Sequence, residues 1–529
     1  MGTALAVTQP APKLGVVLAA LAAAGVLVDR DERRRAAFMV AALVLAAVIL
    51  VGHIADTEQF RSISDDARKL VALGFLGAAT VAALAVLFQR RPEALPVVAV
   101  AVLPFRVPVA TAGSTANLLV PLYLVIAAGC AAHVWNIGRR LASKSSGLRG
   151  DERSATSVVA LALAGFIVLY ALQSLYSRDF DQALEQVVFF YIPFALLFRL
   201  LVDIEWTARL VLVCAGVAVA LAVVFAGIGF LEYDRRELLW NPKVIAANQL
   251  QSYFRVNSVF WDPNIYGRFL MLVMLAVTAF VLWERRNRLV IAAAGLLAIL
   301  WGGLVLTFSQ SSFAALLGGL AVLSALRWDA RRTAAAAFLG LAAASIFVLA
   351  FQSTLKIHLG SSSGVNNVTS GRGDLIAGGL ELIRHRPLWG YGSGSFGRAY
   401  RQERKGNQEE AVSASHTMPI TIGAEQGLIG LVAYAAVLLA AFLTLLGDGV
   451  RAPPALDGRP PRTFVAARAA LAAMFCALVL HTMGYAAFLE DPFTWVLLAA
   501  GVAIAPYASL GWVRVRTTTT REPAPAPVA

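Results

Sequence analysis

Apolar runs that are each long enough to form a membrane-spanning helix recur along almost the whole of this 529-residue chain. About 20 helical residues cross the roughly 30 Å of hydrocarbon in a bilayer. Charged residues make up only 15% of the chain and hydrophobic residues 59%, whereas soluble domains carry roughly 25% charged residues. A water-soluble fold cannot bury that much apolar surface. We therefore predict an all-α polytopic membrane protein, a helix bundle of about 12–15 transmembrane helices. The candidate spans lie near residues 14–28, 36–52, 70–88, 95–110, 117–136, 157–175, 185–202, 208–230, 266–283, 289–307, 312–326, 334–351, 427–446, 464–484 and 493–511.

Basic residues are concentrated in alternate connectors between these runs. By the positive-inside rule, the Arg-dense short turns face the cytoplasm. This explains the formal net charge of +13 without nucleic-acid binding, which we do not expect. The basic turns contain Arg33–Arg35, Arg90–Arg91, Arg139–Arg153, Arg285–Arg288 and Arg327–Arg332.

The same orientation places one large soluble connector on the extracytoplasmic side. We divide the chain into an N-terminal transmembrane bundle (1–351), this extracytoplasmic loop (352–426), C-terminal transmembrane helices (427–511) and a disordered cytoplasmic tail (512–529). The tail is rich in Thr, Pro and Ala, a composition typical of disorder. The loop is too small for a core of its own, so we expect its short helices to lie on the mouth of the bundle.

The end of this loop carries a histidine, His416, directly before a span. A neutral imidazole accepts a proton near pH 7, which makes His a common general base. The alternative is an exposed loop histidine without a chemical role. Two glycines, Gly427 and Gly430, lie three residues apart at the start of the span and allow close backbone approach.

A second feature is a set of basic residues in the predicted extracytoplasmic connectors, where the positive-inside rule leads us to expect few Lys and Arg residues. Arg suits bidentate contact with phosphate oxygens, so a pyrophosphate-bearing lipid substrate would account for the set. The alternative is an ordinary loop surface paired with Asp234, Glu237, Asp374 and Glu381. The set comprises Arg235, Arg236, Lys243, Arg255, Lys356, Arg372, Arg384, Arg386 and Arg398.

Two polar turns accompany this set. Arg255 precedes Asp262-Pro-Asn264, a turn signal that leads into a span. Phe308 to Ser312 forms a short turn that could bind sugar hydroxyls or cap two helices. The glycine-rich run 390–396 lacks the Lys of a nucleotide-binding loop, and no metal-ligand spacing is present; we therefore expect no cofactor and no metal.

These residues resemble the O-antigen ligase and polymerase superfamily of bacterial envelope glycosyltransferases, membrane enzymes of the GT-C type. The family's ligase signature is a His, a small polar residue, nine residues and Gly-x-x-Gly. The chain has His416 and Thr417, then nine residues that include Glu425, then Gly427 and Gly430. The loop sequence RGDLIAGGLELIRHRPLWGYGSGSF, with Arg372 and Arg386, and an Arg shortly before Pro-Asn also match the family pattern. The resemblance covers residues 250–445.

Two positions depart from the family pattern. Thr417 stands where Asn, Ser or Gln is usual. Gln310 stands where many members carry an Arg implicated in pyrophosphate binding, so that contact is lost or supplied by Arg372, Arg386 or another loop residue.

The resemblance implies a glycan transfer from an undecaprenyl-pyrophosphate carrier to an acceptor hydroxyl, at the extracytoplasmic face of the bacterial cytoplasmic (inner) membrane. It implies an inverting, metal-independent enzyme in which His416 orients or deprotonates the acceptor, while Arg255 and Arg372 hold the pyrophosphate. Glu425 is our candidate for orienting His416. The partners are the lipid-linked glycan donor, the bilayer, and a glycan, lipid or protein acceptor. A flippase for lipid-linked glycans, or a protein O-oligosaccharyltransferase of the same family, remains an alternative.

Overall fold

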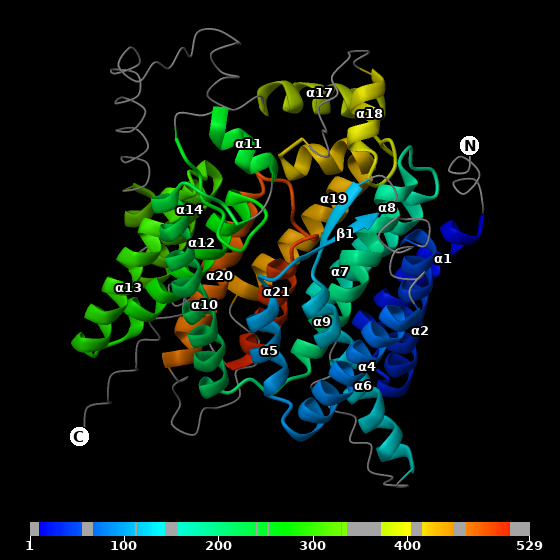
Figure 1. The fold of residues 1–529 in the computed structure, drawn as a ribbon, viewed down its shortest axis with the longest axis horizontal. Coiled ribbons are helices and arrows are strands. Elements are labelled where there is room, and N and C mark those ends of the chain that lie inside the picture. Colours follow the sequence, from blue (N-terminus) through cyan, green and yellow to red (C-terminus); the bar gives the residue numbers. More distant parts are fainter. Residues whose placement is uncertain are drawn as a thin grey trace, which may run out of the picture.

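The structure is a computed structural model, and it describes residues 10–54, 67–111, 114–142, 157–239, 242–250, 253–328, 331–335, 372–403, 415–447 and 462–507. Within these ranges the chain forms an upright bundle of helices with a layer of short helices at one end (Figure 1). Its first half contains α1 (Pro10–Val28), α2 (Glu32–Ile54), α4 (Ala67–Arg90), α5 (Ala94–Val102), α6 (Val120–Ala142), α7 (Val158–Ser174), α8 (Phe180–Gln186), a π-helical turn η3 (Val187–Tyr191), α9 (Ile192–Val202) and α10 (Ala208–Arg235). Its second half contains α11 (Pro242–Leu250), α12 (Pro263–Trp283), α13 (Asn287–Leu306), α14 (Gln310–Arg327), α17 (Arg372–His385), α18 (Phe396–Glu403), α19 (Met418–Leu446), α20 (Arg462–His481), α21 (Pro492–Ile504) and a 3₁₀ turn (Ala505–Tyr507).

The polytopic helical fold is confirmed. Eleven helices within the described ranges are long and apolar enough to cross a membrane, and the segments Val158–Ser174 and Pro492–Tyr507 form shorter apolar helices. The predicted span at 334–351 lies outside the described residues.

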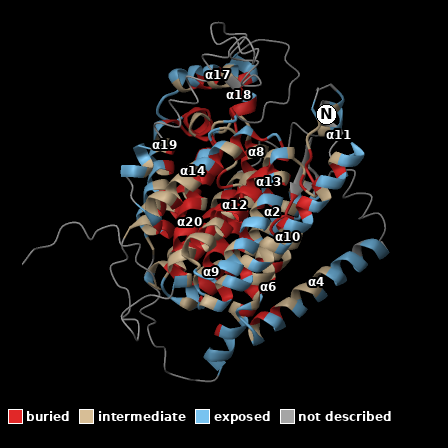
Figure 2. Ribbon diagram, turned by 90° about the vertical axis from the view of Figure 1, so that its left-hand side faces the viewer, coloured by how far each residue is buried: buried red, intermediate tan, exposed pale blue. Residues whose placement is uncertain are grey.

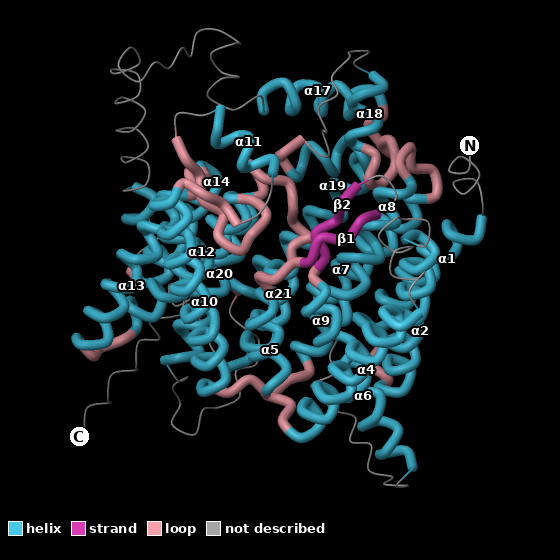
Figure 3. Tube along the Cα trace, in the orientation of Figure 1, coloured by secondary structure: helices cyan, strands magenta, loops and turns pink. Residues whose placement is uncertain are grey.

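The predicted span at 95–110 is wrong. Helix α5 ends at Val102, and the chain then forms a two-stranded antiparallel hairpin, β1 (Val107–Thr111) and β2 (Ser114–Leu118), in which Val107 pairs with Leu118. Figure 3 shows this hairpin in magenta. Pro104 and Pro108 explain the difference, because proline has no backbone N–H to continue a helical hydrogen-bond ladder.

Another proline is accommodated inside a span. Helices α8 and α9 run together through the π-helical turn η3, so the span covers residues Phe180–Val202. Pro193 cannot donate to the carbonyl of Phe189, four residues earlier. The hydroxyl of Tyr123 donates to this carbonyl at 2.6 Å instead. A polar group that would be costly to leave unpaired in a membrane protein is thereby satisfied.

The helices differ strongly in how deeply they are packed. In the apolar windows of α12 and of the α8–α9 span, 72% of the residues are buried, compared with 11% in α4. Figure 2 shows buried residues concentrated around α12 and α20, with α4 lying at the periphery. Helix α12 packs against α20, α13 and α14. The connectors of these central helices therefore lie close together at the two ends of the bundle.

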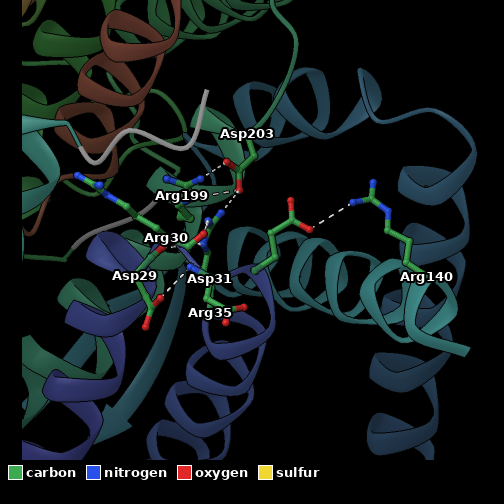
Figure 4. A network of polar contacts seen from close by, with 8 residues as sticks. Asp29, Arg30, Asp31, Arg35, Arg140, Arg199 and Asp203 are labelled. Atoms are coloured by element: carbon green, nitrogen blue, oxygen red, sulfur yellow. Dashed lines mark hydrogen bonds and ion pairs between the residues drawn. The ribbon is translucent and has the colours of Figure 1, made fainter. Parts of the chain in front are cut away.

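The end of the bundle with the Arg-rich turns is held by ion pairs. Arg35 at the start of α2 donates to Asp203, which follows α9, at 3.2 Å, and Arg199 pairs with the same carboxylate. Arg140 at the end of α6 pairs with Glu32 on α2 at 3.3 Å. Figure 4 shows this network. These contacts hold α2, α6 and α9 together at this end of the bundle.

The opposite end of the bundle carries α11, α17 and α18 (Figure 1). Helix α17 packs against α19 and α18, as expected for a loop that lies on the mouth of the bundle. Helix α19 begins at Met418, so the segment 418–426 is the first part of a long helix rather than loop. This early start determines the geometry of the candidate site.

Candidate functional site

Helix α19 is interrupted at Gly427, whose backbone adopts φ 66° and ψ −161°. Such a conformation is essentially restricted to glycine. The break removes helical partners from the neighbouring backbone groups, and the turn after α17 replaces them. The N–H of Leu428 donates to the carbonyl of Pro387 at 2.7 Å, and the N–H of Gly392 donates to the carbonyl of Glu425 at 2.8 Å. The interrupted part of α19 and the turn after α17 thus bind each other through their backbones.

Helix α19 and the turn after α17 approach so closely that neither segment has room for a side chain at the point of contact. A Cβ atom on Gly427 would lie 2.3 Å from the carbonyl oxygen of Leu388, and one on Gly390 would lie 2.3 Å from the carbonyl oxygen of Glu425. Gly390 also has a positive φ of 64°. Close backbone approach, predicted for the glycine pair, therefore occurs at Gly427 between the helix and the loop. Gly430 is buried in the following turn of α19.

The carboxylate of Glu425 holds the glycine-rich loop. One oxygen accepts a hydrogen bond from the N–H of Gly394 at 2.8 Å, and the other accepts from the N–H of Phe396 at 3.0 Å. Phe396 begins α18, and anions at a helix N-terminus are favourable. Glu425 is buried. Its two hydrogen bonds hold the glycine-rich loop against α19, a contact that the sequence alone did not suggest.

His416 lies immediately before α19, is exposed and has a left-handed backbone with φ 59°. Its two neighbours are fixed. The Oγ of Ser415 accepts a hydrogen bond from the N–H of Thr417 at 3.2 Å, and the hydroxyl of Thr417 donates to the carbonyl of Met483 at 3.1 Å. The N–H of Met418 donates to the carbonyl of Thr482. The imidazole is thus presented to solvent from a backbone that is anchored on both sides.

Arg255 lies on a different connector and contacts the serine-rich turn. Its Nε donates to the carbonyl of Thr307 at 2.9 Å, and its Nη2 donates to Asn264 at 3.2 Å. Asn248 on α11 holds the Arg255 backbone at both its N–H and its carbonyl. The guanidinium is therefore oriented by α12 and the 307 turn, while α11 fixes the backbone that carries it. Half-burial leaves part of Arg255 accessible.

The serine-rich turn connects these two parts of the site. Ser309 caps α14, and Gln310, the first residue of that helix, is exposed. The hydroxyls of Ser311 and Ser312 both lie 3.2 Å from Nε2 of His481, the last residue of α20. Residues 482 and 483, which hold the His416 segment, follow directly. A continuous series of contacts thus joins Arg255, through this turn and His481, to His416.

Two of the predicted phosphate ligands lie on the α17 side. Arg386 is exposed, and its guanidinium lies 4.8 Å from the ring centroid of Tyr391. Cation–π contact of this kind orients the guanidinium plane. Arg372 begins α17, but its side chain lies outside the described residues.

The structure adds an ion pair that sequence reasoning missed. Arg268 on α12 and Asp491, which caps α21, are each 1% exposed and lie 2.8 Å apart. Half-buried Arg106, before β1, is close enough to interact electrostatically with both. The available signal was Arg268 itself, a charge inside an apolar run, because intramembrane charges are commonly functional.

Two further ionisable side chains follow α20. Burial raises the pKa of the Tyr485 hydroxyl, which therefore stays protonated and can donate a hydrogen bond. Burial likewise raises the pKa of Glu490; one of its oxygens accepts from the N–H of Phe488 at 3.0 Å, and the other lies 3.4 Å from the hydroxyl of Tyr191. In the part of the chain that the structure describes, no group of three or more His, Cys, Asp or Glu side chains could hold a metal ion.

One part of the chain is similar to a known protein family. Residues 293–435 match the family model described as O-Antigen ligase. This range includes most of α13, all of α14 and the loop helices, His416 and the break of α19. No curated protein matches the chain. Residues 293–435 are therefore similar to the O-antigen ligase family, in agreement with the resemblance that the histidine and glycine motifs indicated.

Proposed function

We propose that this membrane protein transfers a glycan from an undecaprenyl-pyrophosphate carrier to an acceptor hydroxyl on the extracytoplasmic side of the bacterial cytoplasmic membrane. The match of residues 293–435 to the O-antigen ligase family supports a membrane glycan ligase or polymerase. The carrier, the side and the mechanism are our inference. The observation that carries it is exposed His416, whose anchored backbone is linked by contacts to Arg255.

In this reaction His416 accepts the proton of the acceptor hydroxyl, or orients that hydroxyl. The acceptor oxygen forms a bond to the anomeric carbon while the bond from that carbon to the pyrophosphate oxygen breaks, which inverts the configuration. The leaving pyrophosphate keeps the electron pair of the broken bond. A positioned general base contributes roughly 100- to 10,000-fold to such a step.

The leaving group determines what the arginines do. Negative charge develops on the pyrophosphate oxygens as the bond breaks, and fixed cations stabilise it without reorganisation. Arg255 is oriented by three elements and remains partly accessible. Arg372 and Arg386 complete the proposed phosphate-binding set, with Gln310 beside it. By this proposal the reaction requires no metal ion.

Glu425 enters this mechanism indirectly. Its two oxygens hold Gly394 and Phe396, so it fixes the loop against α19 and thereby the helix that His416 precedes. Thr417 contributes through Met483. We assign both residues a positioning function rather than a chemical one.

The test is a His416→Ala substitution in purified protein reconstituted with lipid-linked oligosaccharide and a panel of lipid, glycan and protein acceptors. We expect transfer to fall by at least about 100-fold while the carrier still binds. His385→Ala is the matched control, because His385 is an exposed histidine at the end of α17 and should retain full activity.

Two alternative functions give different outcomes. A flippase would continue to translocate lipid-linked glycan with His416 replaced, and would form no product by mass analysis. A protein O-oligosaccharyltransferase would give product only with the protein acceptor. Normal glycan transfer by the His416→Ala protein would refute the proposed mechanism.

A further inference from the structure

A groove of about 640 Å³ lies between α2 and α6. Its lining residues are well separated in the sequence from those of the proposed reaction. Its walls include Val40 and Val44 from α2, and Ala131, Trp135 and Arg139 from α6. Val44 and Trp135 are more than half exposed. Since both helices are candidate membrane spans, the groove opens toward lipid rather than water.

The groove arises from small residues along one face of α6. Ala127, Ala131, Gly138 and Ala142 line it, and at separations of four, seven and four residues they share one helical face. The two helices are tied at the Arg-rich end by the Arg140–Glu32 ion pair at 3.3 Å (Figure 4). The helices are thus held together at one end while the space beside it is left unfilled.

A space of this size and apolarity needs an occupant. The atoms that line an open apolar groove lack dispersion contacts on that side until an apolar group occupies it. Water would find few hydrogen-bond partners in this apolar groove and would therefore bind there weakly. An acyl chain of a membrane lipid fills such a groove with no desolvation cost.

The charge at the end of the groove indicates which lipid. Arg139 lies four residues after Trp135, so the two side chains share a face, with an aromatic ring followed by a cation as at a membrane interface. Among the described residues Arg139 has no hydrogen-bond or ion-pair partner, whereas adjacent Arg140 is paired with Glu32. Helix α6 ends here, and cations at a helix C-terminus are favourable. The cytoplasmic leaflet, which the Arg-rich turns face, contains anionic lipids.

We propose that the α2–α6 groove is a binding site for one anionic phospholipid of the cytoplasmic leaflet, with an acyl chain against Ala131 and the phosphate at Arg139. The site is independent of the glycan transfer proposed above. It would fill the gap between peripheral α2 and α6 and stabilise the N-terminal helices, on which α4 also packs.

The test is native mass spectrometry of the full-length protein in detergent, titrated with phosphatidylglycerol and with phosphatidylcholine of the same chains. We expect preferential retention of phosphatidylglycerol. Arg139→Gln should weaken its retention about fivefold, as expected for one basic residue at an anionic surface, and leave phosphatidylcholine unchanged. Ala131→Trp, which fills the groove, should reduce retention of both lipids.

Two matched controls accompany these variants. Arg209→Gln makes the same change at an exposed arginine of α10 that does not line the groove, and should retain phosphatidylglycerol. Leu161→Trp adds a ring at a position of α7 that is 54% exposed, and should change nothing. Unaltered thermal unfolding midpoints in lipid-free detergent establish that each variant is folded.

Three results would overturn the inference. Equal retention of the two lipids by the unmodified protein would remove the anionic specificity, and unchanged binding in Ala131→Trp would remove the groove. A co-purified polyprenyl phosphate, found in this groove in place of phospholipid, would assign it to the lipid carrier.

Discussion

The carboxylate of Glu425 accepts a hydrogen bond from the backbone N–H of Gly394 at 2.8 Å. This contact joins a membrane helix to the loop that precedes it and lies beside the break at Gly427. It shows why a glutamate falls nine residues after His416: at that position it reaches the N-terminus of α18 as well.

Glu425→Gln should destabilise the loop, because an amide presents an NH₂ group to one of two N–H donors. Leaving a buried donor unsatisfied costs about 1–3 kcal/mol. We expect a lower thermal midpoint and faster proteolysis between α17 and α19, with transfer activity lost in parallel. Lost activity without any change in loop proteolysis would instead indicate a direct chemical function.

Gly427→Ala should prevent correct docking of the loop. The added Cβ would have to lie 2.3 Å from the carbonyl oxygen of Leu388, at a positive φ. We expect poor yield of monodisperse protein in fluorescence-detected size-exclusion chromatography. Gly165→Ala is the control: Gly165 is inside α7 with nothing near its Cβ position, so the change should be neutral or stabilise by up to about 1 kcal/mol. Equal behaviour of the two variants would contradict the docking geometry.

Gln310→Arg should strengthen donor binding. Gln310 is exposed beside the turn that Arg255 contacts, so an added guanidinium costs little and places a second cation beside that turn. The position at the N-terminus of α14 opposes a cation by only about 0.3–1 kcal/mol. We expect KM for the lipid-linked donor to fall several-fold with kcat nearly unchanged. Gln310→Glu should raise KM; a KM that responds to neither change would place the pyrophosphate elsewhere.

Breaking the Arg268–Asp491 pair should be costly. Removing one partner of a buried ion pair typically costs about 3–5 kcal/mol, because the other charge is left uncompensated. Asp491→Asn retains an oxygen to cap α21, where Asp491 accepts from the N–H of Phe493, so its effect reports the lost charge. In a double-mutant cycle with Arg268→Met, the combined loss in thermal stability should be smaller than the sum. Simple additivity would argue against coupling.

Stability should depend on pH through Glu490. Burial raises the pKa of this carboxyl above its ordinary value of 4.5, so the folded state binds the proton more tightly than the unfolded state. The free energy of unfolding therefore falls as pH rises from about 4.5 through the raised pKa. Glu490→Gln should flatten this part of a thermal-midpoint series between pH 5 and 8. A series with the same slope in both proteins would assign the dependence to other groups.

The amino-acid sequence by itself determined that the chain inserts into a membrane, because the length and apolarity of its runs are local properties. It also provided the His416 and Gly427 motif, which is contiguous. It failed at residues 95–110, where Pro104 and Pro108 outweighed an apolar composition. Only the tertiary structure decided the partners of Gly427, Glu425 and Arg268. Arg268 and Asp491 lie far apart along the chain, and the backbone bonds between α19 and the loop depend on distances that no periodicity encodes. A buried charge or an interrupted helix is tolerated only where another segment supplies its partner, and folding alone brings that segment there.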